Sequence, residues 1–320
     1  MSRVAAIDCG TNSIRLLIAD SAGPILHDVH RENRIVRLGA GVDATGEFAA
    51  DAIERTRAAL ADYADLMRMS AVDAVRMVAT SAARDVSNRD TFFAMTSEIL
   101  GAVVRGATAE VISGTEEASL SFRGAVGELN TAAGPFVVTD LGGGSTETIL
   151  GDTVVRASYS SNIGCVRLTE RCLHSDPPTP TEIADARAVI RDRLAPALLA
   201  VPVEQAHTWV GLAGTMTTLA ALAHGLREYD PDAIHLSTVP FDRLLAVCDD
   251  LIGMTRAQRA ALPVMHPGRV DVIGGGALVV QELVRELRAR TRIDTLTVSE
   301  HDILDGIALS MLDFGQTSKR

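Results

Sequence analysis

The sequence has few aromatic residues, no excess of basic residues and no long uninterrupted hydrophobic run. Aromatic side chains make up 3% of its 320 residues, and 41 acidic against 30 basic residues give a net charge of −11. Such a chain, without basic runs or interleaved aromatic residues, is unsuited to nonspecific DNA or RNA binding. The apolar N-terminal segment carries Asp8, Asn12 and Arg15, which excludes a signal peptide. We expect a soluble, cytoplasmic protein with no membrane segment and no nucleic-acid partner.

Patterned cysteine and histidine residues are also lacking. The four cysteines form no C-x-x-C pair and have no zinc-ligand spacing, and the eight histidines form no H-x-x-x-H pair. We interpret the cysteines as reduced thiols and the histidines as surface or structural residues. The hydrophobic content of 47% is sufficient for the cores of about two domains, which the chain length also suggests.

The most informative stretch is residues 136–152, FVVTDLGGGSTETILGD. Its β-forming start places Asp140 at a strand end, and the three following glycines allow backbone N–H groups to approach an anion. The next residues are mostly β-branched or apolar and end at Gly151, so they predict a strand that returns beside the first and carries Glu147. A Rossmann or P-loop unit would need a helix here, and no lysine stands at the P-loop position.

Residues 4–20 repeat this pattern at a constant offset of 132. The matched pairs are Asp8 with Asp140, Gly10 with Gly142, Ser13 with Ser145, and Asp20 with Asp152. Two copies of D-x-G-x-x-S predict two homologous half-molecules with a phosphate site in the cleft between them. We place the domains at residues 1–133 and 134–302, with a last helix, about 303–320, packing back on the first domain.

Three further segments carry candidate residues, each with two interpretations. Glu116 and Glu117 open a helix, where carboxylates complement the macrodipole, although a carboxylate at this turn can also act as a general base. Arg84 follows Thr80 and Ser81 in a turn that suits either a helix cap or a phosphate contact. A third segment, residues 25–42, has arginines at 31, 34 and 37 that belong to a solvated edge or contact phosphate.

The remaining pattern predicts an alternation of helices and strands. A capping box at Thr179 and Glu182 begins a helix to residue 199, and a small-residue turn at 213–215 separates a strand from a helix. Further helices are expected at 49–69, 90–104, 162–174, 216–226, after residues 272–276 up to about 290, and from 303 to about 314. Further strands are expected at 75–79, 154–161, 209–212 and 295–298.

Taken together, six motifs resemble the exopolyphosphatase and guanosine pentaphosphate phosphohydrolase family. They are DCGTNSIRLLI, ATSAARD, SGTEEA, DLGGGSTE, GLAGT and SEHDILDG, in the family's order and spacing. The family belongs to the actin, sugar kinase and heat-shock ATPase superfamily. The resemblance implies an α/β fold of two duplicated ribonuclease-H-like domains with an interdomain cleft. It also implies a homodimer that uses Mg²⁺, or Mn²⁺ in its place, to release terminal orthophosphate from a phosphoanhydride chain.

The same resemblance assigns roles to individual residues. Glu117 aligns with the catalytic base. Asp140 and Glu147 align with acidic residues that hold the metal or the attacking water, and Asp8 is a further metal candidate. The positions that contact substrate phosphate are Asn12, Ser13, Arg15, Arg84, Gly143, Gly144, Ser145 and Thr146. Arginine, backbone N–H groups and a divalent metal would have to offset the acidic net charge around such a ligand.

Several functions remain open at this point. The first is an exopolyphosphatase acting on inorganic polyphosphate. Its expected preference is for short chains, because the sequence ends after the two-domain core and has Asp302 and Asp305 where the family often has glycine and glutamate. A guanosine pentaphosphate (pppGpp) 5′-phosphohydrolase would use the same residues. An ATP-dependent kinase-like protein would suit the glycine turns but not Glu116 and Glu117, and a phosphate sensor would not need a base.

Overall fold

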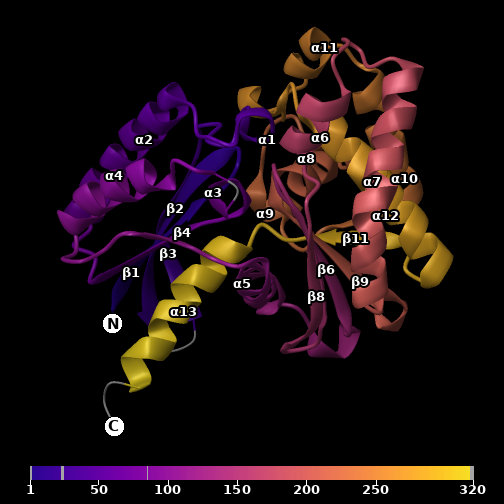
Figure 1. The fold of residues 1–320 in the computed structure, drawn as a ribbon. Coiled ribbons are helices and arrows are strands. Elements are labelled where there is room, and N and C mark those ends of the chain that lie inside the picture. Colours follow the sequence, from indigo (N-terminus) through magenta and orange to yellow (C-terminus); the bar gives the residue numbers. More distant parts are fainter. Residues whose placement is uncertain (1, 23–24, 85, 318–320) are drawn as a thin grey trace. The chain divides into compact units, whose positions relative to one another are not determined.

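The computed structural model describes residues 2–22, 25–84 and 86–317, and its chain divides into two compact units (Figure 1). The first unit comprises Met1–Gly124 together with Ile303–Arg320, and the second comprises Ala125–Asp302. Each unit contains one mixed β-sheet with helices packed on it, and each sheet begins with a hairpin from one copy of the sequence repeat.

The first unit has a five-stranded sheet in the order β3-β2-β1-β4-β5. The first three strands are antiparallel, while β4 and β5 run parallel to β1. The strands are β1 Arg3–Cys9, β2 Ser13–Ala22, β3 Ile25–Ile35, β4 Ala74–Ala79 and β5 Ala109–Val111. The helices are α1 Val42–Thr45, α2 Ala50–Met69, α3 Ser81–Arg84, α4 Arg89–Gly101, α5 Gly114–Val126 and α13 Ile303–Thr317.

Strand β1 is apolar on both sides because helices cover both faces of this sheet. Ala5 and Ile7 belong to a core with residues of α2 and α4, whereas Val4 and Ala6 belong to a second core with Ile307 of α13. Successive side chains of a strand point to opposite faces, so a nearly continuous apolar run is what a doubly covered strand requires. Helix α13 therefore completes the core of the first unit.

The second unit has a six-stranded sheet in the order β10-β11-β9-β6-β7-β8. Strands β6, β7 and β8 are antiparallel, β9 and β11 continue parallel to β6, and β10 is antiparallel at the edge. The strands are β6 Phe136–Leu141, β7 Thr146–Gly151, β8 Val155–Ser161, β9 Thr208–Leu212, β10 Thr238–Pro240 and β11 Thr295–Val298. In its core, Trp209 donates a hydrogen bond through Nε1 to Thr139 Oγ1 at 3.0 Å.

Seven α-helices and three 3₁₀ turns surround this sheet within the described ranges. The α-helices are α6 Cys165–Cys172, α7 Pro180–Ala200, α8 Ala213–Ala223, α9 Pro231–Ile234, α10 Phe241–Gly253, α11 Arg256–Ala260 and α12 Ile273–Arg290. The 3₁₀ turns are Thr131–Ala133, Val203–Gln205 and Pro267–Arg269. The capping box at Thr179 and Glu182 is confirmed. The turn predicted at 213–215 is wrong, because Ala213 begins α8 directly after β9 and takes up the change of direction with a φ of 69°.

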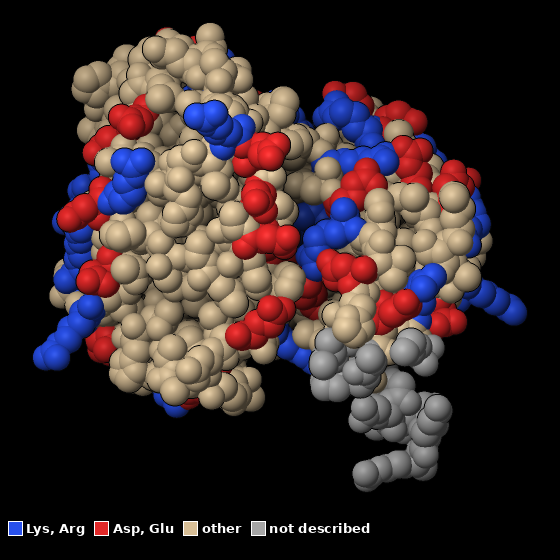
Figure 2. All heavy atoms as spheres, turned by 180° about the vertical axis from the view of Figure 1, so that it is seen from behind, with Lys and Arg blue, Asp and Glu red and all other residues tan. Residues whose placement is uncertain are grey.

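None of the helices in the described ranges combines the length and apolarity needed to cross a bilayer. On the face shown in Figure 2, basic and acidic side chains are interspersed, and basic side chains do not form a broad continuous area there. The chain has many Arg–carboxylate pairs, and some of them lie at the candidate site.

Candidate functional site

The two predicted hairpins are present, and their registers match residue for residue. Asp8 on β1 lies directly opposite Arg15 on β2, and Asp140 on β6 lies directly opposite Glu147 on β7. Both members of the second pair stand 132 positions after their counterparts in the first. The hairpins are thus one backbone arrangement used twice, with a basic residue at one position of the first copy and an acidic residue at that position of the second.

In the first hairpin, the arginine and the carboxylate form an ion pair. Nη2 and Nε of Arg15 donate to Oδ2 of Asp8 at 2.7 and 3.0 Å. The Asp8 side chain is 8% exposed and that of Arg15 is 20% exposed. The pair therefore holds a carboxylate and a guanidinium at the end of β1, with opposite charges already in contact.

The adjacent glutamates at the start of α5 differ in their surroundings. Glu116 pairs with Arg76 at 2.7 Å, and its side chain is 45% exposed. Glu117 is buried, and its Oε2 accepts a hydrogen bond from Nη1 of Arg84 at 2.8 Å. The same Arg84 nitrogen donates to the carbonyl oxygen of Ile112 at 3.1 Å. The structure therefore separates an exposed structural glutamate from a buried one that is held by a predicted phosphate-binding arginine.

In the second hairpin, two carboxylates lie side by side at the sheet. Asp140 is 8% exposed and Glu147 is 1% exposed. Side chains directly opposite on antiparallel strands have Cβ atoms about 5 Å apart, and like charges at such positions repel. Oε1 of Glu147 accepts a hydrogen bond at 2.6 Å from Ser160, which is its direct neighbour on β8. The row Asp140, Glu147 and Ser160 thus crosses three adjacent strands.

The glycine loop between β6 and β7 is held from one side by the first turn of α6. The amide of Cys165 donates to the carbonyl of Gly142 at 3.0 Å, and the amides of Val166 and Arg167 donate to the carbonyl of Gly143 at 3.0 and 3.1 Å. In a planar trans peptide, the N–H points opposite to the C=O. The N–H groups of Gly143 and Gly144 therefore point away from α6. Neither amide has a hydrogen-bond acceptor in the described part of the chain.

The loop of the first hairpin is tied in a related way. Gly10 donates to Ser13 at 2.9 Å, as Gly142 donates to Ser145 at 3.1 Å. The carbonyl of Asn12 accepts hydrogen bonds from the amides of Val36 and Arg37, which directly follow β3. By the same peptide geometry, the N–H of Ser13 points away from these residues. Both loops thus present backbone donors, as an anion-binding turn does.

A divalent cation fits the residues of the second hairpin. Two buried carboxylates at neighbouring strand positions are oxygen ligands of the kind that Mg²⁺ and Mn²⁺ prefer, and a dication would offset their mutual repulsion. Asp8 offers carboxylate oxygens of the same kind, and its Oδ2 accepts hydrogen bonds from Arg15.

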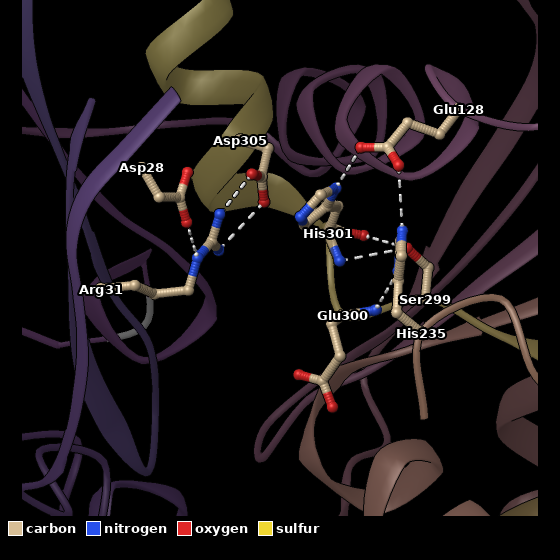
Figure 3. A network of polar contacts seen from close by, with 8 residues as sticks. All are labelled: Asp28, Arg31, Glu128, His235, Ser299, Glu300, His301 and Asp305. Atoms are coloured by element: carbon tan, nitrogen blue, oxygen red, sulfur yellow. Dashed lines mark hydrogen bonds and ion pairs between the residues drawn. The ribbon is translucent and has the colours of Figure 1, made fainter. Parts of the chain in front are cut away.

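The arginines of the third candidate segment have local partners. Arg31 on β3 makes two hydrogen bonds to Asp305 at the start of α13, at 2.5 and 3.2 Å, and one to Asp28 at 2.8 Å (Figure 3). Arg34 pairs with Glu32 and Asp62. Arg31 and Arg34 thus bind carboxylates of the first unit. The Arg31 pair also explains what Asp305 does here, since it ties α13 to the edge of the sheet.

Figure 3 also shows a cluster that sequence reasoning missed, formed within the second unit by Glu128, His235 and His301. Their possible ligand atoms lie within 4.8 Å of one another. However, Nδ1 of His235 accepts a hydrogen bond from the Glu300 amide at 3.2 Å, so the ring proton lies on Nε2 and faces Glu128 at 3.3 Å. A metal-bound imidazole has the opposite polarity, with a bare nitrogen toward the ion and an N–H donated outward. The cluster is therefore better explained as a hydrogen-bonded network.

The charge of Glu128 in this network follows from its partners. Burial opposes ionisation of the Glu128 carboxyl, but the hydrogen bond from His235 and the neighbouring His301 outweigh it and hold its pKa below the ordinary value. His301 Nδ1 lies 2.8 Å from Glu128 Oε1. Nothing in the sequence spacing predicts this cluster, because Glu128 and His235 are 107 positions apart.

All four cysteines are free and buried, as the sequence pattern predicts. Burial raises the pKa of the Cys165 thiol to about 11, although a hydrogen bond with Thr215 and the nearby Arg269 act in the opposite direction. A thiol with this pKa is protonated at neutral pH and is a poor nucleophile. Cys165 contributes to the site through its backbone amide.

Comparison with known proteins places the chain in a family. A model described as the Ppx/GppA phosphatase family matches residues 17–311. The chain is 70% identical to "Exopolyphosphatase 2" of Mycobacterium tuberculosis over 315 residues, which are 97% of this chain and 99% of that protein. The chain belongs to the Ppx/GppA phosphatase family.

Solved structures give the same result. A crystal structure of an exopolyphosphatase-like protein is 42% identical, has a TM-score of 0.91, and matches over 98% of this chain and 99% of its own. The Aquifex aeolicus member of the Ppx/GppA family is 30% identical with a TM-score of 0.80, and the match covers 98% of both chains. The predicted family and the predicted fold class, α/β with two duplicated sheet domains, are confirmed.

The structure groups the predicted site residues by unit. In the first unit, Arg15 is paired with Asp8 and Arg84 with Glu117. In the second unit, the loop residues Gly143 and Gly144 adjoin the hairpin that carries the two carboxylates. Sequence reasoning missed Ser160 and the first turn of α6. The first turn of α6 had one signal in the sequence, which was Gly164. This glycine lies between apolar residues, and neither a turn motif nor the repeat explains it.

Proposed function

We propose that this protein is an exopolyphosphatase, which hydrolyses the terminal phosphoanhydride bond of inorganic polyphosphate and releases orthophosphate. The observation that carries the proposal is the second hairpin, where outward amide N–H groups adjoin two buried carboxylates. One hairpin thus offers donors for phosphate oxygens and ligands for a divalent cation, and a polyphosphate with its counter-cation requires both. The 70% identity to a protein named exopolyphosphatase supports the same activity.

In the proposed reaction, a water oxygen attacks the terminal phosphorus and the bond from phosphorus to the bridging oxygen breaks. Glu117 accepts the proton of the attacking water, and the shortened chain leaves with the electron pair of the bridging oxygen. The Glu117 carboxylate is buried and fixed by Arg84, so it is held in one orientation. Arg84 and Arg15 are proposed to bind phosphate oxygens, together with the side chains of Asn12, Ser13 and Ser145 and the amides of Gly143 and Gly144. Thr146 is a further candidate, whose hydroxyl would have to release the carbonyl of Ile163.

We assign the divalent metal to Asp140 and Glu147, with Asp8 as a third candidate whose pairing with Arg15 would have to loosen. Bound Mg²⁺ or Mn²⁺ would neutralise charge on the phosphoanhydride oxygens. The chain's own contribution is to hold the two carboxylates on adjacent strands, with Ser160 fixing one of them. The homodimer expected from the family resemblance remains a prediction.

The test compares three proteins: wild type, Glu117→Gln and Glu116→Gln. Orthophosphate release is measured from short polyphosphate, long polyphosphate and pppGpp, with and without Mg²⁺. We expect Mg²⁺-dependent release from polyphosphate, reduced by roughly two to four powers of ten in Glu117→Gln. Glu116→Gln, whose glutamate pairs with Arg76 in the same helical turn, should stay near wild type.

Each alternative has its own outcome in this assay. Faster release from pppGpp than from any polyphosphate would replace the proposed substrate. Release only from long chains would contradict the short-chain preference that the departures at Asp302 and Asp305 predict. Near-wild-type turnover in Glu117→Gln would remove the base assignment, and no release from any substrate would favour a kinase-like or sensor function.

A further inference from the structure

The corner between β8 and α6, residues 160–167, contacts the second hairpin at Glu147, at Thr146 and at the glycine loop. Ser160 donates to Glu147 at 2.6 Å, and Thr146 donates through Oγ1 to the carbonyl of Ile163 at 2.6 Å. The amides of residues 165–167 donate to the carbonyls of Gly142 and Gly143. One continuous segment therefore fixes a proposed metal ligand, a proposed phosphate-binding side chain and the direction of the glycine peptides.

These contacts also satisfy the start of α6. The first amides of an α-helix have no intrahelical partner, and they are usually satisfied by a capping side chain or by water. No side chain caps α6, and its amides at 165, 166 and 167 are satisfied by the glycine-loop carbonyls. Movement of the loop would leave these donors without partners, so the helix start and the loop stabilise each other.

Gly164 is the residue that permits this approach. A Cβ placed on Gly164 would lie 2.4 Å from the carbonyl carbon and oxygen of Gly143 and 2.6 Å from the nitrogen of Gly144. Its φ of −151° is an extended conformation that any residue can adopt. Any Cβ at this position would overlap the peptide that directs the Gly144 N–H outward. The position therefore requires glycine.

We infer that the β8–α6 corner positions the phosphate loop and the metal ligands. Gly164 determines the conformation of the loop, and Ser160 orients the Glu147 carboxylate. Neither residue touches the reacting atoms in this account, and both act through the groups they hold. The inference rests on the proposed function for its kinetic readouts. It predicts that the two halves of the corner affect different parameters, because Gly164 controls amide direction and Ser160 controls a carboxylate.

The experiment uses two variants with matched controls in the same unit. Gly164→Ala is compared with Gly253→Ala, where a Cβ would have no neighbour within 4 Å. Ser160→Ala is compared with Ser158→Ala, two residues earlier on the same strand and face, opposite Ile149. The melting temperature, kcat, KM for polyphosphate and the Mg²⁺ concentration for half-maximal activity are measured for each, and orthophosphate binding is measured by calorimetry.

We expect Gly164→Ala to lower kcat/KM by about 100-fold and to weaken orthophosphate binding. Ser160→Ala should raise the half-maximal Mg²⁺ concentration by about 10- to 100-fold, with KM at saturating Mg²⁺ little changed. Both controls should match wild type. A folded Gly164→Ala with wild-type KM and orthophosphate binding, or a Ser160→Ala with wild-type Mg²⁺ dependence, would overturn the inference.

Failure of the proposed function can be distinguished from failure of this inference. If Gly164→Ala does not accumulate as folded protein, the Mg²⁺ dependence of Ser160→Ala decides the question alone. If the wild-type protein hydrolyses no polyphosphate, the proposed function fails, while calorimetry with orthophosphate and with Mg²⁺ still tests the corner. Unchanged binding of both ligands in both variants would then contradict it.

Discussion

The two hairpins share a register, yet one residue position gives them opposite electrostatic character. In the first, Arg15 faces Asp8 and the two form an ion pair. In the second, Glu147 faces Asp140 and the hairpin carries two neighbouring carboxylates. The duplicated backbone thus carries an ion pair in its first copy and two neighbouring carboxylates, the proposed ligands of a divalent cation, in its second.

The supports of the two loops differ in the same way. The first loop is tied to the residues that directly follow β3, and the second to the first turn of a helix. Each places peptide N–H groups on the side away from its support. The comparison indicates that the repeated motif defines the turn, while the segment packed behind it decides which donors are presented.

The largest effect is expected when the charge of Glu147 in the second hairpin is removed. Glu147→Gln keeps the size of the side chain but removes its charge and replaces one acceptor oxygen with an N–H donor group. We expect activity to fall by more than about 100-fold, because a metal ligand should matter at least as much as the residues that orient it. Steady-state hydrolysis at several Mg²⁺ concentrations measures this.

Asp8→Asn is the matched change in the first hairpin. It should lower activity less than Asp140→Asn does, because Asp140 and Glu147 together are the proposed metal ligands and Asp8 is the third candidate. An equal or larger loss of activity in Asp8→Asn would mean that both hairpins contribute to cation binding. This result would contradict the difference between the two hairpins.

An intermediate effect concerns the buried pair of Arg84 and Glu117 in the first unit. Arg84→Ala leaves Glu117 buried without this partner, and breaking such a pair destabilises by about 3–5 kcal/mol. Because the Arg84 side chain is 22% exposed, we expect the lower end of that range. Urea unfolding is measured for the wild type, for Arg84→Ala, for Glu117→Gln and for the variant that combines both changes. These four proteins form a double-mutant cycle. If the double variant is no more stable than Arg84→Ala, the two residues do not interact as described.

The smallest effect tests a part of the second unit away from the hairpin. Hydrogen bonds from the amide of Thr179, and then from those of His174 and Ser175, lower the pKa of Glu182 from 4.5 to about 2. A carboxyl with a lowered folded-state pKa stabilises the protein above its unfolded pKa, and this contribution is lost as pH falls from about 4.5 to about 2.

Glu182→Gln keeps one acceptor oxygen for the capping box but removes the charge and the second acceptor oxygen, so only the pH-dependent part of its stability difference reports the charge. The stability difference between wild type and this variant should therefore shrink as the pH falls from about 4.5 to about 2, the window in which the folded and unfolded carboxyl differ in protonation. Thermal unfolding at a series of pH values measures it. A difference that is constant with pH would show that the charge of Glu182 does not contribute.

The sequence predicted most of the hairpin architecture because the two copies repeat the same residue types at one offset. Asp8, Asp140 and the glycine turns identified both strand pairs, and the observed registers confirm them. Capping at Thr179 was predictable for a similar reason, since the interacting residues are three positions apart. These features depend on local spacing, which a single sequence records directly.

The missed features depend on contacts between distant positions or on the backbone alone. Arg31 pairs with Asp305, 274 positions away, so spacing could not identify its partner. The hydrogen bonds from α6 to the glycine loop involve only peptide groups, which every residue except proline provides. Gly164 was visible in the sequence, but the need for glycine at this position arises from the proximity of Gly143. Only the folded chain shows that proximity.

The most direct test of the central claim is a titration with Mn²⁺ followed by electron paramagnetic resonance, which needs no assumption about substrate. The account predicts a stoichiometric site in the wild-type protein that is lost in Glu147→Gln and in Asp140→Asn. Folding of each variant is checked by its thermal unfolding. Mn²⁺ binding that is unchanged in both variants would contradict the claim that the second hairpin holds the divalent cation.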